Sequence, residues 1–127
     1  MIAPNRDRPW RLLAAGLALG AAASHFALSI VNLIPGQSTA GPLFAAMGAG
    51  YAGVAVFVLL RKPLLDRLAA LYTALLLLAY IASRLPIDTP SPIEPIGVTT
   101  KVVEAILLVV LVLLIRGSRA PSPSATP

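Results

Sequence analysis

The chain has 127 residues with a net charge of +5; 57% of them are apolar, only 12% are charged, and none is cysteine. A soluble globular domain carries about 25% charged residues, so this composition excludes an ordinary soluble protein. The absence of cysteine excludes thiol catalysis, a disulfide scaffold and a cysteine-ligated iron–sulfur cluster.

Four apolar runs follow one another along the chain, each close to the roughly 20 residues needed to cross a hydrocarbon core. We predict spans at 12–34, 43–60, 64–84 and 98–115. Pro35-Gly36 ends the first run and Arg61-Lys62-Pro63 ends the second. Because backbone in lipid must satisfy its own hydrogen bonds, and because the runs do not alternate in polarity, we expect helices rather than barrel strands.

The placement of the cations predicts the orientation of these spans. Two of them, Arg84 and Lys101, fall on one side of the membrane. Eight fall on the other side: Arg6, Arg8, Arg11, Arg61, Lys62, Arg67, Arg116 and Arg119. By the positive-inside rule this bias argues against dual topology and puts both termini in the cytoplasm, in the plasma (inner) membrane of a prokaryote. Cations at span ends also fit a bilayer better than a nucleic acid, which we do not expect as a partner.

Short connections between the runs predict an all-α, up-down four-helix bundle. Residues 12–116 form its single transmembrane domain, between a basic N-terminal segment at 1–11 and a disordered Pro/Ser-rich tail at 117–127. We interpret the aromatic and cationic residues at the span ends as topology anchors: Trp10, Arg11, Arg61, Lys62, Arg84 and Arg116. Besides the lipid bilayer, the expected partners are other membrane subunits or further copies of the chain.

An alternative interpretation concerns the first span. Arginines followed by an apolar stretch and Ala21-Ala22-Ala23 have the outline of a cleavable signal peptide. The apolar run continues to Ile34, however, which gives it the length of a complete span. We therefore favour an uncleaved helix.

Small residues recur at four-residue spacing, which is typical of close helix packing in lipid. Gly16, Gly20 and Ser24 form such a ridge on the first span. The second span has two more ridges, Ala46 with Gly50 and Ala49 with Gly53. We expect these ridges at helix interfaces, although Ala and Gly are also simply common in the chain.

Polar side chains gather in the half of the spans that the orientation places outward. His25, Ser29 and Asn32 share one face of the first span, because they are spaced i, i+4 and i+7. Ionisable groups in a membrane are costly and usually face the bundle interior, so the neighbourhood of His25 and of Glu104 in the fourth span is the natural candidate site. The pattern leaves open whether the two side chains meet. By depth, at 1.5 Å per residue, the candidate polar site comprises His25, Ser29, Tyr51, Tyr80 and Glu104.

Each of these residues also has a purely structural explanation. His25 would fix helix register through a hydrogen bond, Lys101 would neutralise Glu104, and Tyr80 suits the aromatic belt at the membrane surface. One histidine and one carboxylate fall short of a metal site or a haem site, so we expect no metal and no cofactor. No catalytic constellation is visible, so we do not expect an enzyme.

Three functions remain compatible with this pattern. The leading hypothesis is a non-enzymatic accessory or scaffold subunit, or a binder of a lipophilic ligand. The first alternative is a small proton- or ion-coupled transporter that uses His25 and Glu104, because a histidine near a carboxylate in low dielectric can exchange a proton. The second alternative is a membrane subunit of a quinone-linked redox complex.

The order of several short motifs resembles that in a broad group of uncharacterised small four-helix membrane proteins of bacteria and archaea. These motifs are a histidine in the first span, Ile34-Pro35, Gly41-Pro42-Leu43-Phe44 opening the second span, Tyr80 to Arg84 closing the third, and a glutamate early in the fourth. More remotely, the architecture is similar to that of the DoxX-like membrane proteins, some of which are implicated in sulfur or quinone redox. The resemblance implies a fold and a location; no functional motif of that group is matched residue by residue, so it implies no activity.

Overall fold

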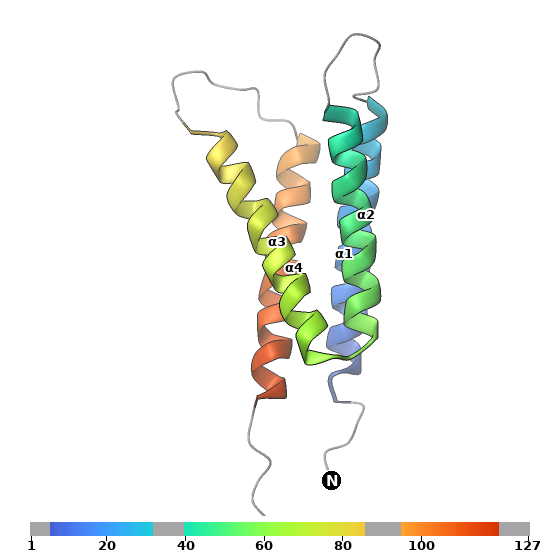
Figure 1. Ribbon diagram of the computed structural model, residues 1–127, viewed down its shortest axis with the longest axis vertical. Helices are drawn as coiled ribbons and strands as arrows, with labels where there is room; N and C mark the ends of the chain where they lie inside the picture. Colours follow the sequence, from blue (N-terminus) through green and yellow to red (C-terminus); the bar gives the residue numbers. More distant parts are fainter. Residues whose placement is uncertain (1–5, 32–39, 86–94, 120–127) are drawn as a thin grey trace, which may run out of the picture.

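The computed structural model describes residues 6–31, 40–85 and 95–119. Within these ranges the chain is all-helical, with α1 (Arg8–Val31), α2 (Ala40–Leu59), α3 (Pro63–Ser83) and α4 (Pro95–Ser118) in the arrangement of Figure 1. All four helices are long and apolar enough to cross a membrane. The prediction of four membrane-compatible helices is therefore confirmed. Asn32, most of the connectors after the first and third helices, and the tail beyond residue 119 lie outside the described residues.

All four helices begin before the predicted spans, α1 by four residues, α2 and α4 by three and α3 by one. α1 begins at Arg8, inside the predicted N-terminal segment, and α4 continues to Ser118, inside the predicted tail. A charged residue ends an apolar run without ending a helix, because its long side chain can reach the headgroups while the backbone stays helical. Between α2 and α3 the chain turns sharply: Arg61 has a left-handed φ of 56°, and Pro63 follows in the first turn of α3.

The described helices pack in a ring in which α1 contacts α2 and α4, and α3 contacts α4 and, least extensively, α2. In Figure 1 α3 leans away from α2 toward the upper end of the view. The core lies between small residues of α1 and larger ones of the other helices, such as Ala18, Val54 and Leu111. Alanine on α1 lets its neighbours approach closely, which is how helices without a hydrophobic driving force associate in lipid.

The glycines of the predicted ridges differ in whether they contact another helix. Gly16 and Gly20 are exposed in the described chain, and a Cβ added to either meets no atom within 4 Å. The expectation that they pack at an interface is therefore wrong for the interior of this bundle, where the alanines of α1 take that role. The close approach of α1 and α2 occurs instead at Gly48, where a Cβ would lie 3.1 Å from the Ala22 carbonyl oxygen and from the Phe26 ring.

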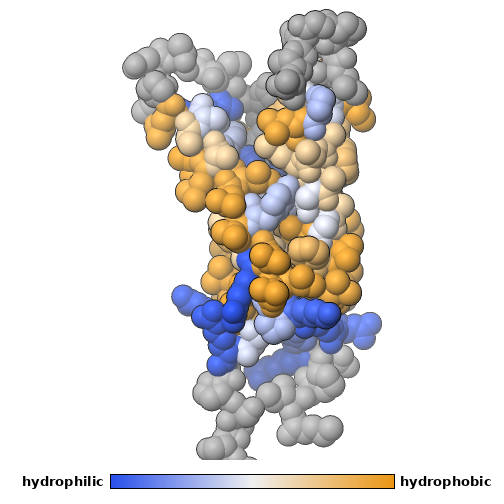
Figure 2. Space-filling view, in the orientation of Figure 1, coloured by the Kyte–Doolittle hydropathy of each residue, from blue (hydrophilic) through white to orange (hydrophobic). Residues whose placement is uncertain are grey.

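The surface divides into an apolar band and a charged end. Large apolar side chains are exposed on every helix, among them Leu19, Val56, Leu75 and Val109. Figure 2 shows hydrophilic residues gathered at the lower end, where the chain begins, below this band. An apolar exterior of this extent is the surface expected of a protein surrounded by lipid.

Candidate functional site

His25 of α1 and Glu104 of α4 meet inside the bundle. The His25 Nε2 and Glu104 Oε1 atoms are 2.7 Å apart, and the two side chains are only 2% and 0% exposed. His25 lies on the inner face of α1 because it shares that face with Ala18 and Ala22, which pack in the core. The structure therefore brings together the two residues that the sequence pattern places near each other.

Lys101 holds the second oxygen of the same carboxylate. Its Nζ donates to Glu104 Oε2 over 2.6 Å from the preceding turn of α4. The Lys101 side chain is 17% exposed, whereas Glu104 is fully buried. Lys101 thus supplies the counter-charge from a partly accessible position, and His25 adds a fully buried hydrogen-bond partner; together they offset the cost of burying the carboxylate.

Two aromatic side chains of α2 enclose the His25 ring. Tyr51 stacks on it with a centroid separation of 5.4 Å and an interplanar angle of 14°, and Phe44 lies at 6.0 Å and 32°. Tyr51 is itself fully buried and meets the edge of Tyr72 from α3 at 5.2 Å. The cluster therefore includes side chains from all four helices.

Tyr72 reaches this position because Gly50 has no side chain. Its hydroxyl donates to the Met47 carbonyl oxygen over 2.9 Å, and a Cβ on Gly50 would collide with that hydroxyl. Gly50 thus serves as the contact point between α2 and α3, as the ridge pattern predicts for it. The partner is an aromatic ring rather than another small residue.

Two polar atoms of the cluster are buried and make no hydrogen bond of good geometry among the described residues: His25 Nδ1 and the Tyr51 hydroxyl, which lies near Glu104 and Thr73. Buried polar atoms are nearly always paired, so each such exception calls for an explanation. When His25 Nε2–H donates to the Glu104 carboxylate, Nδ1 of the neutral ring is left as an acceptor. The site then offers one acceptor and one hydroxyl that can donate or accept.

Ser29 and Tyr80, also predicted for the site, have other contacts. The Ser29 hydroxyl donates to the Gly41 carbonyl oxygen over 2.7 Å and so joins the end of α1 to the beginning of α2. Tyr80 lies beside Lys101 and Arg84, whose cationic groups are 5.2 Å and 5.1 Å from its ring centroid. Tyr80 is therefore connected to Glu104 through Lys101, and Ser29 ties helices together.

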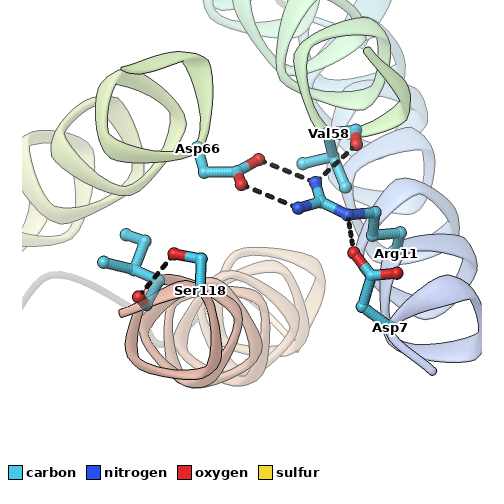
Figure 3. Close-up of polar contacts among 6 residues, drawn as sticks. Asp7, Arg11, Val58, Asp66 and Ser118 are labelled. Atoms are coloured by element: carbon cyan, nitrogen blue, oxygen red, sulfur yellow. Dashed lines mark hydrogen bonds and ion pairs between the residues drawn. The ribbon is translucent and has the colours of Figure 1, made fainter. Parts of the chain in front are cut away.

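A second buried cluster surrounds Arg11, which the sequence pattern assigns to the membrane surface. Arg11 is only 6% exposed, and Asp66 of α3 is fully buried. The Arg11 guanidinium donates to both Asp66 oxygens over 3.0 Å and to the Val58 carbonyl oxygen over 2.9 Å (Figure 3). Its Nε donates to Asp7 over 2.5 Å, and this hydrogen bond lowers the pKa of Asp7 below its usual value. The interpretation of Arg11 as a surface anchor is therefore incomplete.

A signal for this cluster is present in the sequence. Arg11 precedes Ala18 by seven residues and His25 by fourteen, so all three lie on the same face of α1. The remaining anchors are exposed or half-buried near helix ends: Trp10, Arg61, Lys62, Arg84 and Arg116. Of these six anchors, only Arg11 lies near a helix end and also on the helix face that packs in the core.

An apolar layer separates the two polar clusters. Leu107 and Leu111 of α4 and Val54 and Val58 of α2 are buried there against the alanines of α1. Within the described residues no group of three or more His, Cys, Asp or Glu side chains is placed to hold a metal ion. The arrangement is suited to holding a polar group or exchanging a proton at the His25 end.

Comparison with protein-family models, with curated proteins and with solved structures finds no match for this chain. The similarity to DoxX-like proteins therefore stays a prediction.

Proposed function

We propose that this chain is a non-enzymatic integral membrane protein that binds the polar head of a lipophilic ligand beside His25, Tyr51 and Glu104. In this proposal the four helices form an up-down bundle in a prokaryotic plasma membrane. The eight-to-two distribution of cations supports cytoplasmic termini. The ligand site then lies in the outer half of the membrane.

The two unpartnered atoms carry this proposal. Because Glu104 already has two nitrogen partners, a ligand that binds here does not have to supply a positive charge. His25 Nδ1 and the Tyr51 hydroxyl would each gain a partner from a neutral head that bears hydroxyl or carbonyl groups. Heads of this kind include quinols and quinones.

A groove between α2 and α3 provides a route from the lipid. It has a volume of about 250 Å³ and is lined mostly by apolar residues, with Gly50 and Gly53 on one side and Leu68 and Tyr72 on the other. Tyr72 contacts Tyr51, which stacks on His25. An apolar tail in this groove would place its head at the aromatic end of the cluster.

Ligand binding is tested with decylubiquinone as the probe and with a straight-chain hydrocarbon, which has no polar head, as its control. Tyr51→Phe deletes only the unpartnered hydroxyl, and His25→Phe keeps a flat ring between Phe44 and Tyr51. The loss of one hydrogen bond predicts roughly three- to tenfold weaker binding in each variant. Ser29→Ala, which removes a hydroxyl bonded elsewhere, is the matched control and should bind as the wild type does. Equal affinity in all four proteins would rule the proposal out.

A second candidate, proton-coupled transport, rests on the sharing of one carboxylate by His25 and Lys101. A carboxylate with two nitrogen partners can exchange one for the other as protons bind and leave. The apolar layer below the cluster favours binding over passage. Dissipation of a pH gradient in proteoliposomes decides between transport and binding. A transporter gives a proton flux with the wild type that Glu104→Gln abolishes, whereas a binding protein gives no flux with either protein.

A further inference from the structure

Two cations from different helices converge on one aromatic ring at the end of the bundle near His25. Arg84 follows the last turn of α3 and Lys101 lies near the beginning of α4. The Arg84 guanidinium carbon is 5.1 Å and the Lys101 Nζ 5.2 Å from the Tyr80 ring centroid. Both distances are within the range of cation–π contacts, so both cations contact the same ring.

The charges around this ring are unbalanced in the part of the chain that the structure describes. There, Lys101 is paired with Glu104, which also binds His25, and the Arg84 guanidinium contacts the Tyr80 ring but no carboxylate. Asp88 and Glu94 belong to the connector outside the described residues. The positive end of the α4 helix dipole lies at the same end of the bundle.

Partial exposure makes both cations available to an anion. Arg84 is half-buried, and the Lys101 side chain is 17% exposed. A guanidinium presents several fixed donors that match the oxygens of a phosphate, and an ammonium adds a point charge beside it. Phosphate groups are also the anions that surround a membrane protein at the ends of its helices.

We propose that Arg84 and Lys101, held together by Tyr80, form a binding site for a phosphate-bearing anion, such as the headgroup of an anionic membrane lipid. The phosphate would take Arg84 as its main partner and share Lys101 with Glu104. This proposal does not depend on a ligand at His25, because Arg84, its main cation, contacts the Tyr80 ring rather than the His25–Glu104 pair.

The test uses the full chain in a non-ionic detergent, with phosphatidylglycerol and phosphatidylcholine of identical tails as probes and native mass spectrometry as the readout. Near a membrane surface each basic residue contributes an amount equal to about a fivefold change in affinity for an anionic lipid. Arg84→Gln and Lys101→Gln should therefore each weaken phosphatidylglycerol binding about fivefold relative to phosphatidylcholine. Arg84→Lys keeps the positive charge and should therefore retain most of the phosphatidylglycerol binding.

Arg116→Gln is the matched control, because it removes an exposed cation from the far end of α4. A loss in Arg84→Gln together with wild-type binding in Arg116→Gln supports the site. Inorganic phosphate then identifies the source of the anion: a lipid site resists millimolar phosphate, whereas a free-phosphate site loses its lipid to it. Equal preference for phosphatidylglycerol in the wild type, Arg84→Gln and Arg116→Gln would overturn the proposal, whatever the affinity for decylubiquinone.

Discussion

Arg11 and Asp66 are joined by two parallel hydrogen bonds of 3.0 Å, which link the beginning of α1 to the first turn of α3. In the described residues these two helices do not pack directly against each other. A bidentate arginine–carboxylate pair is among the strongest and most directional polar contacts in proteins. It therefore fixes how far apart the two helices stand at this end of the bundle.

Removing one partner of this pair should be strongly destabilising. Asp66→Asn or Arg11→Met leaves the other group buried without its counter-charge, which costs about 3–5 kcal/mol of unfolding free energy. The combined Arg11→Met/Asp66→Leu protein leaves no buried charge at this pair and should recover most of that loss. Reversible unfolding in mixed detergent micelles measures all three. Additive losses in the double variant would show that the two residues act independently.

Gly50→Ala should separate α2 from α3. The added methyl group occupies the position of the Tyr72 hydroxyl, so the hydrogen bond to Met47 is lost or the helices move apart, at a cost of about 1–3 kcal/mol. Gly53→Ala is the control: it lies one turn further along the same helix and meets no atom within 4 Å. Its stability should stay within about 0.5 kcal/mol of the wild type. Similar effects of the two changes in thermal unfolding would contradict this account of the glycine.

The two neighbours of Glu104 should respond differently when its charge is removed. In Glu104→Leu, the partly exposed Lys101 can turn toward the membrane surface, while the buried His25 Nε2 loses its partner, at a cost of about 1–3 kcal/mol. Glu104→Gln keeps an oxygen that can accept from the histidine, so this variant should lose less stability than Glu104→Leu. Carbon-13 and nitrogen-15 chemical shifts of the single histidine ring report whether Nε2 remains hydrogen-bonded. An unchanged His25 spectrum in Glu104→Leu would show that the pair does not persist in the membrane.

Asp7 should contribute a small acid-sensitive part of the stability. Its hydrogen bond from Arg11 lowers its pKa below the usual 3.8, so the folded chain favours the carboxylate. The resulting stabilisation is present above the usual pKa and is lost as the pH falls through the lowered value. Because 41% of the side chain is exposed, the contribution is less than about 1 kcal/mol. On acidification Asp7→Asn should therefore lose less thermal stability than the wild type does. Parallel curves of melting temperature against pH for the two proteins would exclude this contribution of Asp7.

The fold was largely predictable from the sequence, because uninterrupted apolar runs of spanning length leave few structures open to the backbone. The shared depth of His25 and Glu104 followed from their positions in the spans, and the cost of charge in lipid favoured an interior place for both; their direct contact was left open. The Arg11–Asp66 pair was missed because it joins residues 55 positions apart. The register of Arg11 with Ala18 and His25 could have been read from the sequence, but the rotation of α3 that turns Asp66 inward could not. The stacking of Tyr51 on His25 likewise depends on how α2 is rotated about its axis. Because α2 is apolar on all sides, its sequence does not show which face turns inward.

The apolar layer between the two polar clusters also keeps them energetically independent. Fourteen residues of α1 separate Arg11 from His25, a rise of about 21 Å, and buried apolar side chains of α1, α2 and α4 fill the space between them. Because the two clusters share no side chain, a double variant that combines Asp66→Asn with Glu104→Gln should lose the sum of the two single losses of stability.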